Sequence, residues 1–216
     1  MLTLLSERAI IVLYFTAETR RARACNDAGF PLSGVKRTEG AVLKRFLIVV
    51  DMQKDFVDGA LGSKEACAIV PAAVRKIEAF DGEIFATFDT HFDNYMDTAE
   101  GKKLPVPHCI KGTEGWQLNK DIAAALAKKK YTPVEKLTFG SVDLPKLIKK
   151  AAGGEEFTLE LIGLCTDICV ISNALLLKAS FPEVPIAVDE KCCAGVTPAK
   201  HDAAIETLKS CQIDIL

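Results

Sequence analysis

Residues 163–170 of the chain read Gly163-Leu164-Cys165-Thr166-Asp167-Ile168-Cys169-Val170, and this stretch separates two apolar segments of different periodicity. A short apolar segment, Phe157–Ile162, precedes it and is typical of a buried strand. Apolar residues recur at helical spacing after it, which predicts a helix over residues 167–178. The glycine between the two segments indicates a sharp turn from a strand into a helix.

This arrangement makes Cys169 a candidate nucleophile. The side chain of Thr166 or Asp167 can cap the first free N–H groups of the helix, which leaves Cys169 in the first helical turn. Unsatisfied backbone donors and the positive end of the helix dipole both favour a thiolate there. A buried structural thiol is the alternative, because free cysteine also packs as a small hydrophobic residue. The stretch by itself leaves both interpretations open.

The composition indicates one globular domain. With 216 residues, the chain is long enough for one large α/β domain and short for two. Hydrophobic residues make up 49%, charged residues 26%, and the formal net charge is −2. A nucleic-acid-binding surface would need a basic excess, and no apolar run approaches the length of a transmembrane helix. We therefore expect neither a nucleic acid nor a membrane as a partner.

The eight cysteines lack the spacing of a disulfide scaffold. They are spread over a mid-sized chain without a convincing signal peptide, so we expect reduced thiols and a cytoplasmic location. Cys165 and Cys169 make a poor zinc pair, because they follow a C-x₃-C spacing and no second such pair follows them.

Residues 1–41 differ from the rest of the chain. The apolar run Ala9–Phe15 is too short to span a bilayer and lacks a cleavage site of the secretory kind. The basic run Arg20–Arg23 is typical of a transit peptide, but acidic residues nearby oppose that interpretation. We interpret residues 1–41 as a non-catalytic N-terminal extension and assign residues 42–216 to one domain.

Strand-like and helix-like segments alternate from Arg45 onward. The expected strands cover residues 46–50, 83–88, 131–135, 157–162, 185–188 and 213–216. The expected helices cover residues 121–130, 144–151, 167–178 and 198–210. Pro71 suits the first turn of one more helix, which ends at Phe80. This alternation predicts an α/β fold, a doubly wound six-stranded parallel sheet with helices on both faces.

Three reactive side chains follow predicted strands. Asp51 ends the first strand, Lys136 ends the third, and Cys169 follows the fourth, at the sheet edge where such folds bind ligands. Taken alone, Asp51 could instead cap the next turn, and Lys136 would be a solvated surface charge by default. Together they suit acyl transfer, in which Asp51 takes the thiol proton, Lys136 stabilises the charges and Cys169 attacks a carbonyl carbon. Backbone N–H groups of the 163–169 turn would meet the developing oxyanion.

A second group of residues points to a metal ion. Asp89 and His91 follow the second strand two residues apart, so their side chains leave the same side of the backbone. A carboxylate and an imidazole held there are ligands for Zn²⁺, Fe²⁺ or Mn²⁺. Asp97, Glu100 and His108 lie downstream in a turn-rich loop. A lone histidine is more often structural, but two histidines with neighbouring carboxylates favour one divalent metal ion.

The chain resembles a known family, the isochorismatase-like cysteine hydrolases, and within it the nicotinamidases. The resemblance covers residues from about 45 to 216. It rests on five segments in a fixed order, VDMQKDF at 50–56, DTH at 89–91, HCIKGT at 108–113, EKLTFGS at 135–141 and GLCTDICV at 163–170. Together these segments are highly specific for the family.

The resemblance implies two groups of functional residues. The family's triad and metal site fall on Asp51, Lys136, Cys169, Asp89, His91 and His108. The N–H groups of Cys165 and Cys169 would form the oxyanion hole, and members commonly have a cis peptide bond where this chain has Leu164–Cys165. Phe56, in the first matching segment, would belong to the substrate pocket.

The fourth metal ligand stays open at this point. Many nicotinamidases have another histidine six residues after the first, and this chain has Asp97 there. Some members use a glutamate further along instead, and the side chain of Glu100 reaches further than that of Asp97. We therefore expect Glu100 to complete the metal site, directly or through a water molecule.

The resemblance implies an amidohydrolase that converts nicotinamide to nicotinate and ammonia in NAD salvage. Its substrate would be a small amide, and the metal ion would hold the pyridine nitrogen. One alternative is hydrolysis of another small amide or carbamoyl compound; another is an isochorismatase, which needs neither metal nor thiol. A non-catalytic binding module is disfavoured because the whole triad is present. The sequence leaves open whether the chain forms a homo-oligomer.

Deletion of residues 1–41 should leave activity and thermal stability nearly unchanged, because the segment has no place in the strand and helix pattern. Thermal denaturation and turnover of the shortened chain check this. A large loss of either quantity would show that the extension is needed by the domain.

Overall fold

The computed structural model describes residues 43–216. The predicted extension lies outside the described residues, so its non-catalytic nature stays a prediction. None of the helices in the described part has the length and apolar character needed to cross a bilayer. The cysteines between residues 43 and 216 are free thiols, as expected.

Six parallel strands form one sheet in the order β3-β2-β1-β4-β5-β6. Their bounds are β1 Lys44–Val50, β2 Glu83–Asp89, β3 Tyr131–Lys136, β4 Phe157–Leu164, β5 Ile186–Ala194 and β6 Asp214–Ile215. The chain runs outward from β1 to β3 and then returns to β4 on the other side of β1. The prediction of a doubly wound six-stranded sheet is confirmed, and its switch point lies between β1 and β4.

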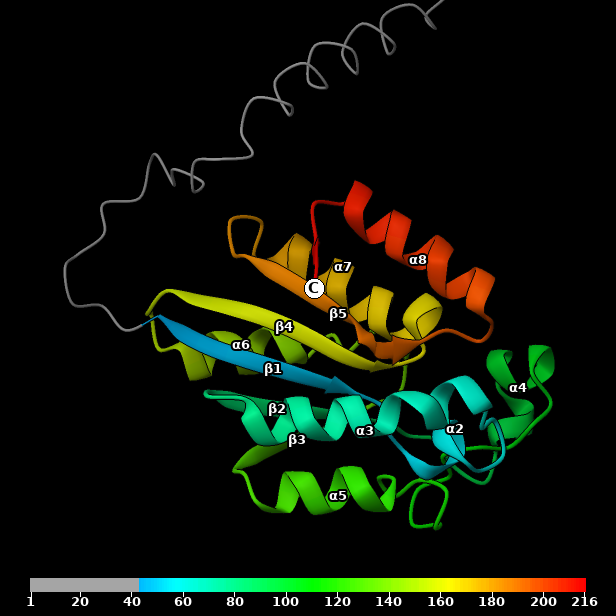
Figure 1. The fold of residues 1–216 in the computed structure, drawn as a ribbon. Coiled ribbons are helices and arrows are strands. Elements are labelled where there is room, and N and C mark those ends of the chain that lie inside the picture. Colours follow the sequence, from blue (N-terminus) through cyan, green and yellow to red (C-terminus); the bar gives the residue numbers. More distant parts are fainter. Residues whose placement is uncertain (1–42) are drawn as a thin grey trace, which may run out of the picture. The chain divides into compact units, whose positions relative to one another are not determined.

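Helices cover both faces of this sheet (Figure 1). One face carries α3 (Lys64–Ala79) and α5 (Lys120–Ala127), and the other carries α6 (Leu144–Ala152), α7 (Ile171–Ser180) and α8 (Pro198–Ser210). Four short elements lie in the connections after strands, namely α2 Lys54–Val57, the 3₁₀ turn η2 Tyr95–Asp97, α4 Ala99–Lys103 and the π-helical turn η3 Thr166–Val170.

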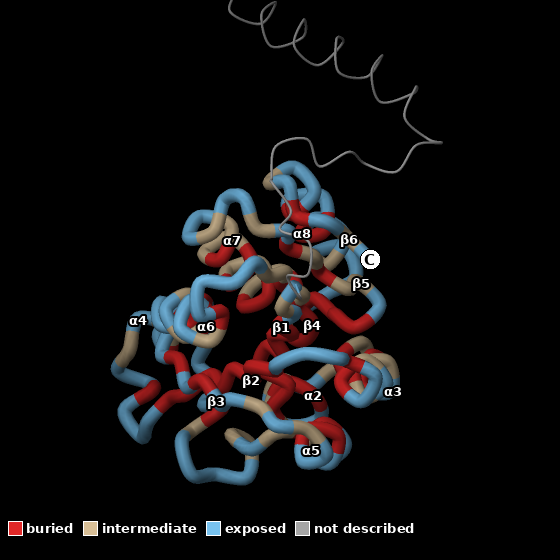
Figure 2. Tube along the Cα trace, turned by 90° about the vertical axis from the view of Figure 1, so that its left-hand side faces the viewer, coloured by how far each residue is buried: buried red, intermediate tan, exposed pale blue. Residues whose placement is uncertain are grey.

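The alternation of side chains along β1 divides the core into two layers. Leu47 and Val49 pack with α3 and α5, whereas Phe46, Ile48 and Val50 pack with α6, α7 and α8. All five are fully buried, as expected for a parallel strand covered on both faces. Figure 2 shows burial concentrated along the strands and exposure along the outer sides of the helices.

The predicted start of α3 at Pro71 is wrong, because the helix begins seven residues earlier, at Lys64. The hydroxyl of Ser63 accepts a hydrogen bond from the N–H of Ala66 at 3.0 Å and caps the helix. Pro71 lies inside α3. Serine before a helical pattern was the stronger signal for the start of this helix.

The turn after β4 differs from its prediction in its cap and in its first helical turn, because Cys169 lies in the π-helical turn η3 and α7 begins only at Ile171. Gly163 has φ +119°, and a side chain there would collide with the carbonyl oxygen of Val50, so glycine is required. The Leu164–Cys165 peptide bond is cis, as the resemblance implied. Neither Thr166 nor Asp167 caps the helix, because their side chains contact His201 and the N–H of Val196 instead.

Candidate active site

The three predicted catalytic residues meet at the carboxyl edge of the sheet. The ammonium nitrogen of Lys136 lies 2.8 Å from Oδ2 of Asp51 and 3.6 Å from Sγ of Cys169. All three side chains are buried, with exposed fractions of 0% for Asp51, 3% for Lys136 and 4% for Cys169. The register of the strands explains why these residues lie close together. Val50, which precedes Asp51, pairs with Gly163 of β4, and Asp89 of β2 pairs with Lys136 of β3.

Thr87 orients the carboxylate of Asp51. Its hydroxyl donates a hydrogen bond to Oδ1 of Asp51 at 2.6 Å and accepts one from the N–H of Asp51 at 3.2 Å. The backbone of Asp51 is left-handed, with φ +46°, a region that aspartate tolerates better than most residues. The sequence prediction missed Thr87, although its place two residues before Asp89 puts both side chains on one side of β2.

Burial controls the protonation of the nucleophile. It raises the pKa of the Cys169 thiol well above its usual value, and the neighbouring Asp51 carboxylate raises it further. Burial also raises the pKa of Asp51, against the opposing effect of Lys136. The expectation that the helix end favours a resting thiolate is therefore wrong. Cys169 lies in the π-helical turn η3, where dehydration and the Asp51 carboxylate disfavour the thiolate more than Lys136 favours it.

A second group lies beside the first and consists of Asp89, His91, Glu100 and His108. One potential ligand atom from each residue lies within 4.8 Å of the others. Nε2 of His91 is 3.1 Å from Oδ2 of Asp89, and Nε2 of His108 is 3.8 Å from Oε1 of Glu100. The structure thus places Glu100, on α4, in this group of potential ligands. Asp97 is exposed and lies outside the group.

The donor set and its surroundings fit a divalent metal ion. Two imidazoles and two carboxylates are common ligands of Zn²⁺, Fe²⁺ and Mn²⁺. Nδ1 of His108 lies 2.8 Å from the carbonyl oxygen of Val106, which leaves Nε2 facing the other ligands. The ring of Tyr95 packs edge-on against both imidazoles, and that of Phe56 packs against His108 at 5.4 Å. Phe56 is thus placed beside this group of ligands.

One carboxylate joins the two groups. Oδ1 of Asp89 accepts a hydrogen bond from Lys136 at 2.9 Å, while Oδ2 faces His91. The backbone of Asp89 is fixed by Gln53, whose amide donates to the Asp89 carbonyl at 2.9 Å and accepts from its N–H at 2.8 Å. Gln53 was also missed as a site residue. Its amide side chain carries no chemical signature in the sequence.

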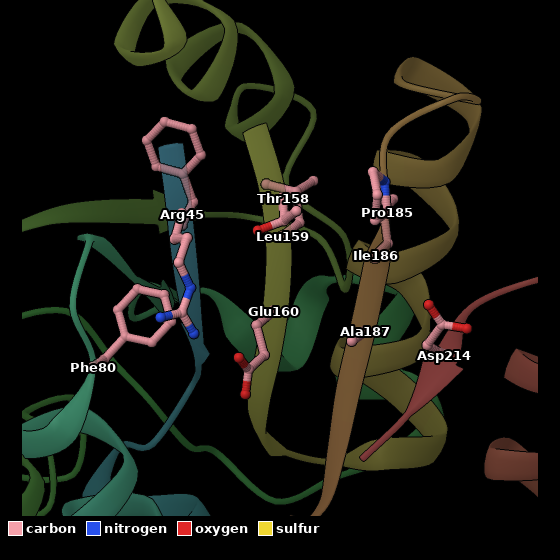
Figure 3. Close-up of a pocket in the computed structure, with 10 residues that line it drawn as sticks. Arg45, Phe80, Thr158, Leu159, Glu160, Pro185, Ile186, Ala187 and Asp214 are labelled. Atoms are coloured by element: carbon pink, nitrogen blue, oxygen red, sulfur yellow. The ribbon is translucent and has the colours of Figure 1, made fainter. Parts of the chain in front are cut away.

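A separate cavity of about 180 Å³ lies near the opposite edge of the sheet (Figure 3). It is lined by residues near the amino ends of strands, including Arg45, Thr158 and Ala187. The guanidinium of Arg45 lies over the ring of Phe80, 4.9 Å from its centroid. The predicted site residues do not line this cavity, so we assign the candidate active site to the carboxyl edge.

Known proteins share this sequence and fold. The family model described as "Isochorismatase domain" matches residues 45–216. The nicotinamidase/pyrazinamidase of Mycobacterium tuberculosis is 26% identical over 187 residues, which cover 80% of this chain and 98% of that protein. The chain therefore belongs to the isochorismatase family, which confirms the resemblance.

Solved structures agree with this assignment. The crystal structure of nicotinamidase/pyrazinamidase PncA from Bacillus subtilis has a TM-score of 0.70 and 27% identity, covering 80% of this chain and 99% of that one. Pyrazinamidase of Pyrococcus horikoshii, in complex with zinc, has a TM-score of 0.63 and 25% identity, covering 80% and 98%. N-carbamoylsarcosine amidase from Thermoplasma acidophilum has a TM-score of 0.63 and 26% identity, covering 80% and 95%.

Replacing Glu100 with alanine should lower the bound metal content sharply, because it removes one of the four gathered ligand atoms. Asp97→Ala is the matched control, since it removes an exposed carboxylate from the same loop, and it should retain the metal. Elemental analysis of the purified variants measures this. Metal loss from Asp97→Ala together with retention by Glu100→Ala would reverse the assignment.

Proposed function

We propose that the protein is a nicotinamidase, which hydrolyses nicotinamide to nicotinate and ammonia through a thioester on Cys169. The observation that carries this proposal is the buried contact of Lys136 with Asp51 and Cys169 beside a four-residue group of potential metal ligands. The similarity to the Mycobacterium tuberculosis enzyme, over nearly its whole length, supports the same substrate class. We place the reaction in NAD salvage in the cytoplasm.

The mechanism begins with transfer of a proton. Cys169 is a neutral thiol in the resting site, so attack of Sγ on the amide carbon must be coupled to removal of its proton. Asp51 is the base, because Lys136 contacts both its Oδ2 and the sulfur of Cys169, and its Oδ1 is held by Thr87. The ammonium of Lys136 stabilises both the sulfur and the carboxylate while the proton moves.

The developing oxyanion would be bound by the N–H groups of Cys165 and Cys169, in the turn between β4 and α7. Protonated Asp51 then returns its proton to the leaving nitrogen, which departs as ammonia. A water molecule attacks the thioester and gives a proton to Asp51. The carbon–sulfur bond breaks, the sulfur of Cys169 takes the proton back from Asp51, and the acid product leaves as nicotinate after losing its own proton to solvent.

Asp89, His91, Glu100 and His108 would hold the divalent metal ion. The ion would supply a Lewis acid that binds the pyridine nitrogen of the substrate. The residues of this chain orient that end of the site, because Gln53 fixes the backbone of Asp89 and Tyr95 packs against both imidazoles.

Hydrolysis of another small amide is the second candidate function. The structural similarity to N-carbamoylsarcosine amidase, an enzyme named for a carbamoyl substrate, favours it. The proposed triad would act in the same way on a carbamoyl carbon. Ammonia release from nicotinamide and from N-carbamoylsarcosine, measured side by side, separates the two functions, and turnover of the second compound alone would replace our proposal.

Cys169→Ala should abolish turnover and leave the fold intact, because it removes only the nucleophile. Mass spectrometry of the wild-type protein, quenched during turnover, should show an acyl adduct on Cys169. An adduct on Cys165 or Cys109 would contradict the assignment. Circular dichroism of the variant provides the control for folding.

Asp51→Asn should lower kcat by roughly 10²–10⁴-fold, the usual contribution of a general base. The amide keeps the shape of the side chain but cannot take the thiol proton. Steady-state kinetics with nicotinamide measure the effect. Asp58→Asn is a suitable control, since Asp58 is exposed and pairs only with Lys54 among the described ion pairs. A kcat close to wild type for Asp51→Asn would rule out Asp51 as the base.

A further inference from the structure

Asn173 is a fully buried polar residue that the proposed mechanism does not use. It lies on α7, one helical turn after Cys169. Its amide nitrogen donates hydrogen bonds to the carbonyl oxygens of Cys169 at 2.8 Å and Phe139 at 3.2 Å. Its amide oxygen accepts a hydrogen bond from the N–H of Ser141 at 2.9 Å. One side chain therefore links the backbone of the nucleophile to the segment that follows Lys136.

The linked segment, residues 137–143, is held mainly through its backbone. Its large apolar side chains point to solvent, with exposed fractions of 65% for Leu137, 46% for Phe139 and 66% for Val142. Burial of these side chains therefore cannot fix the position of the segment. Gly140 lies close to the backbone of α7, because an added Cβ would be 3.2 Å from the carbonyl oxygen of Ser172 and would displace the end of the Leu176 side chain. Asn173 forms hydrogen bonds with Phe139 and Ser141, the residues on either side of Gly140, and these bonds hold the segment against α7.

The same hydrogen bonds bear on the geometry of the proposed triad. Cys169 lies in η3, a turn whose N-terminus has no side-chain cap. Lys136 ends β3, directly before the segment that Asn173 holds. The contact between Nζ of Lys136 and Sγ of Cys169, at 3.6 Å, therefore joins two parts of the chain that Asn173 also joins.

We propose that Asn173 is a positioning residue, which holds the backbone of Cys169 and the 137–143 segment in the arrangement that keeps the thiol against Lys136. The inference rests on the proposed function for its kinetic consequence only. Asn173 does not touch the reacting atoms, so it acts through Cys169. Loss of its hydrogen bonds should displace Sγ and lower the rate of the chemical step, because small misplacements of reacting groups are costly.

Asn173→Leu tests this proposal, because leucine keeps the volume of the side chain and removes all three hydrogen bonds. We expect kcat for nicotinamide to fall roughly 10-fold or more with little change in KM. The rate at which iodoacetamide alkylates Cys169, followed by peptide mass spectrometry at one fixed pH, should fall by about threefold or more. Alkylation proceeds through the thiolate form of the side chain, and a displaced sulfur would lose the contact with the Lys136 ammonium that stabilises this form.

Thr138→Val is the matched control. It removes a hydrogen bond within the same segment, from the Thr138 hydroxyl to the carbonyl of Gly140, and leaves Asn173 untouched. Both its kcat and its alkylation rate should stay within about twofold of wild type, as is usual for an exposed substitution. Equal losses in Thr138→Val and Asn173→Leu would overturn the proposal, because any disturbance of the segment would then suffice.

An alkylation rate in Asn173→Leu equal to or faster than that of wild type overturns the proposal. If Asn173→Leu does not fold, Asn173→Ala takes its place in the same measurements. Failure of both variants to fold would also overturn it, since Asn173 would then be needed by the fold as a whole. Absence of nicotinamide turnover in the wild-type protein would refute the proposed function instead, while the alkylation comparison would still decide the role of Asn173.

Discussion

The ion pairs of the buried Lys136 ammonium hold the centre of the candidate site together. The ammonium lies between the carboxylates of Asp51 and Asp89 and touches the sulfur of Cys169. A charge without partners would be strongly destabilising at this depth, and here two carboxylates compensate it. Burial alone would lower the pKa of Lys136, but the attraction of the two carboxylates raises it. The ammonium therefore stays charged, and it contacts side chains from the carboxyl ends of β1 and β2 and from the turn η3.

Much of the fold followed from the sequence because its signals are local and repeat. Strand-like segments that lead into Asp51, Asp89 and Lys136 were predicted from the sequence, and parallel strands bring their carboxyl ends to one edge of the sheet whatever the lengths of the loops. The helix α3 begins at Lys64 and not at Pro71, because Ser63 caps its first turn and a proline is tolerated further along. An error at the end of a helix leaves the predicted sheet unchanged, since the sheet was predicted from the alternation of strand-like and helix-like segments along the chain.

The candidate site was predictable only where the side chains carry chemistry of their own. Thiol, imidazole, ammonium and carboxylate groups identified its centre. Thr87, Gln53 and Asn173 were missed because hydroxyl and amide side chains are common everywhere, and only their partners in space reveal a role. The ionisation of Cys169 was misjudged for a related reason, since dehydration depends on what covers the thiol and not on its neighbours in sequence.

The alternation along β1 limits how this protein can change during evolution. Its buried side chains pack on two faces in turn, and the strand leads directly into Asp51. Single replacements in Phe46–Val50 would alter one layer of the core. An insertion or deletion of one residue would exchange both layers and turn Asp51 away from Lys136. The length of this strand is therefore fixed more strictly than its composition, whereas loops far from the site are free to vary in length.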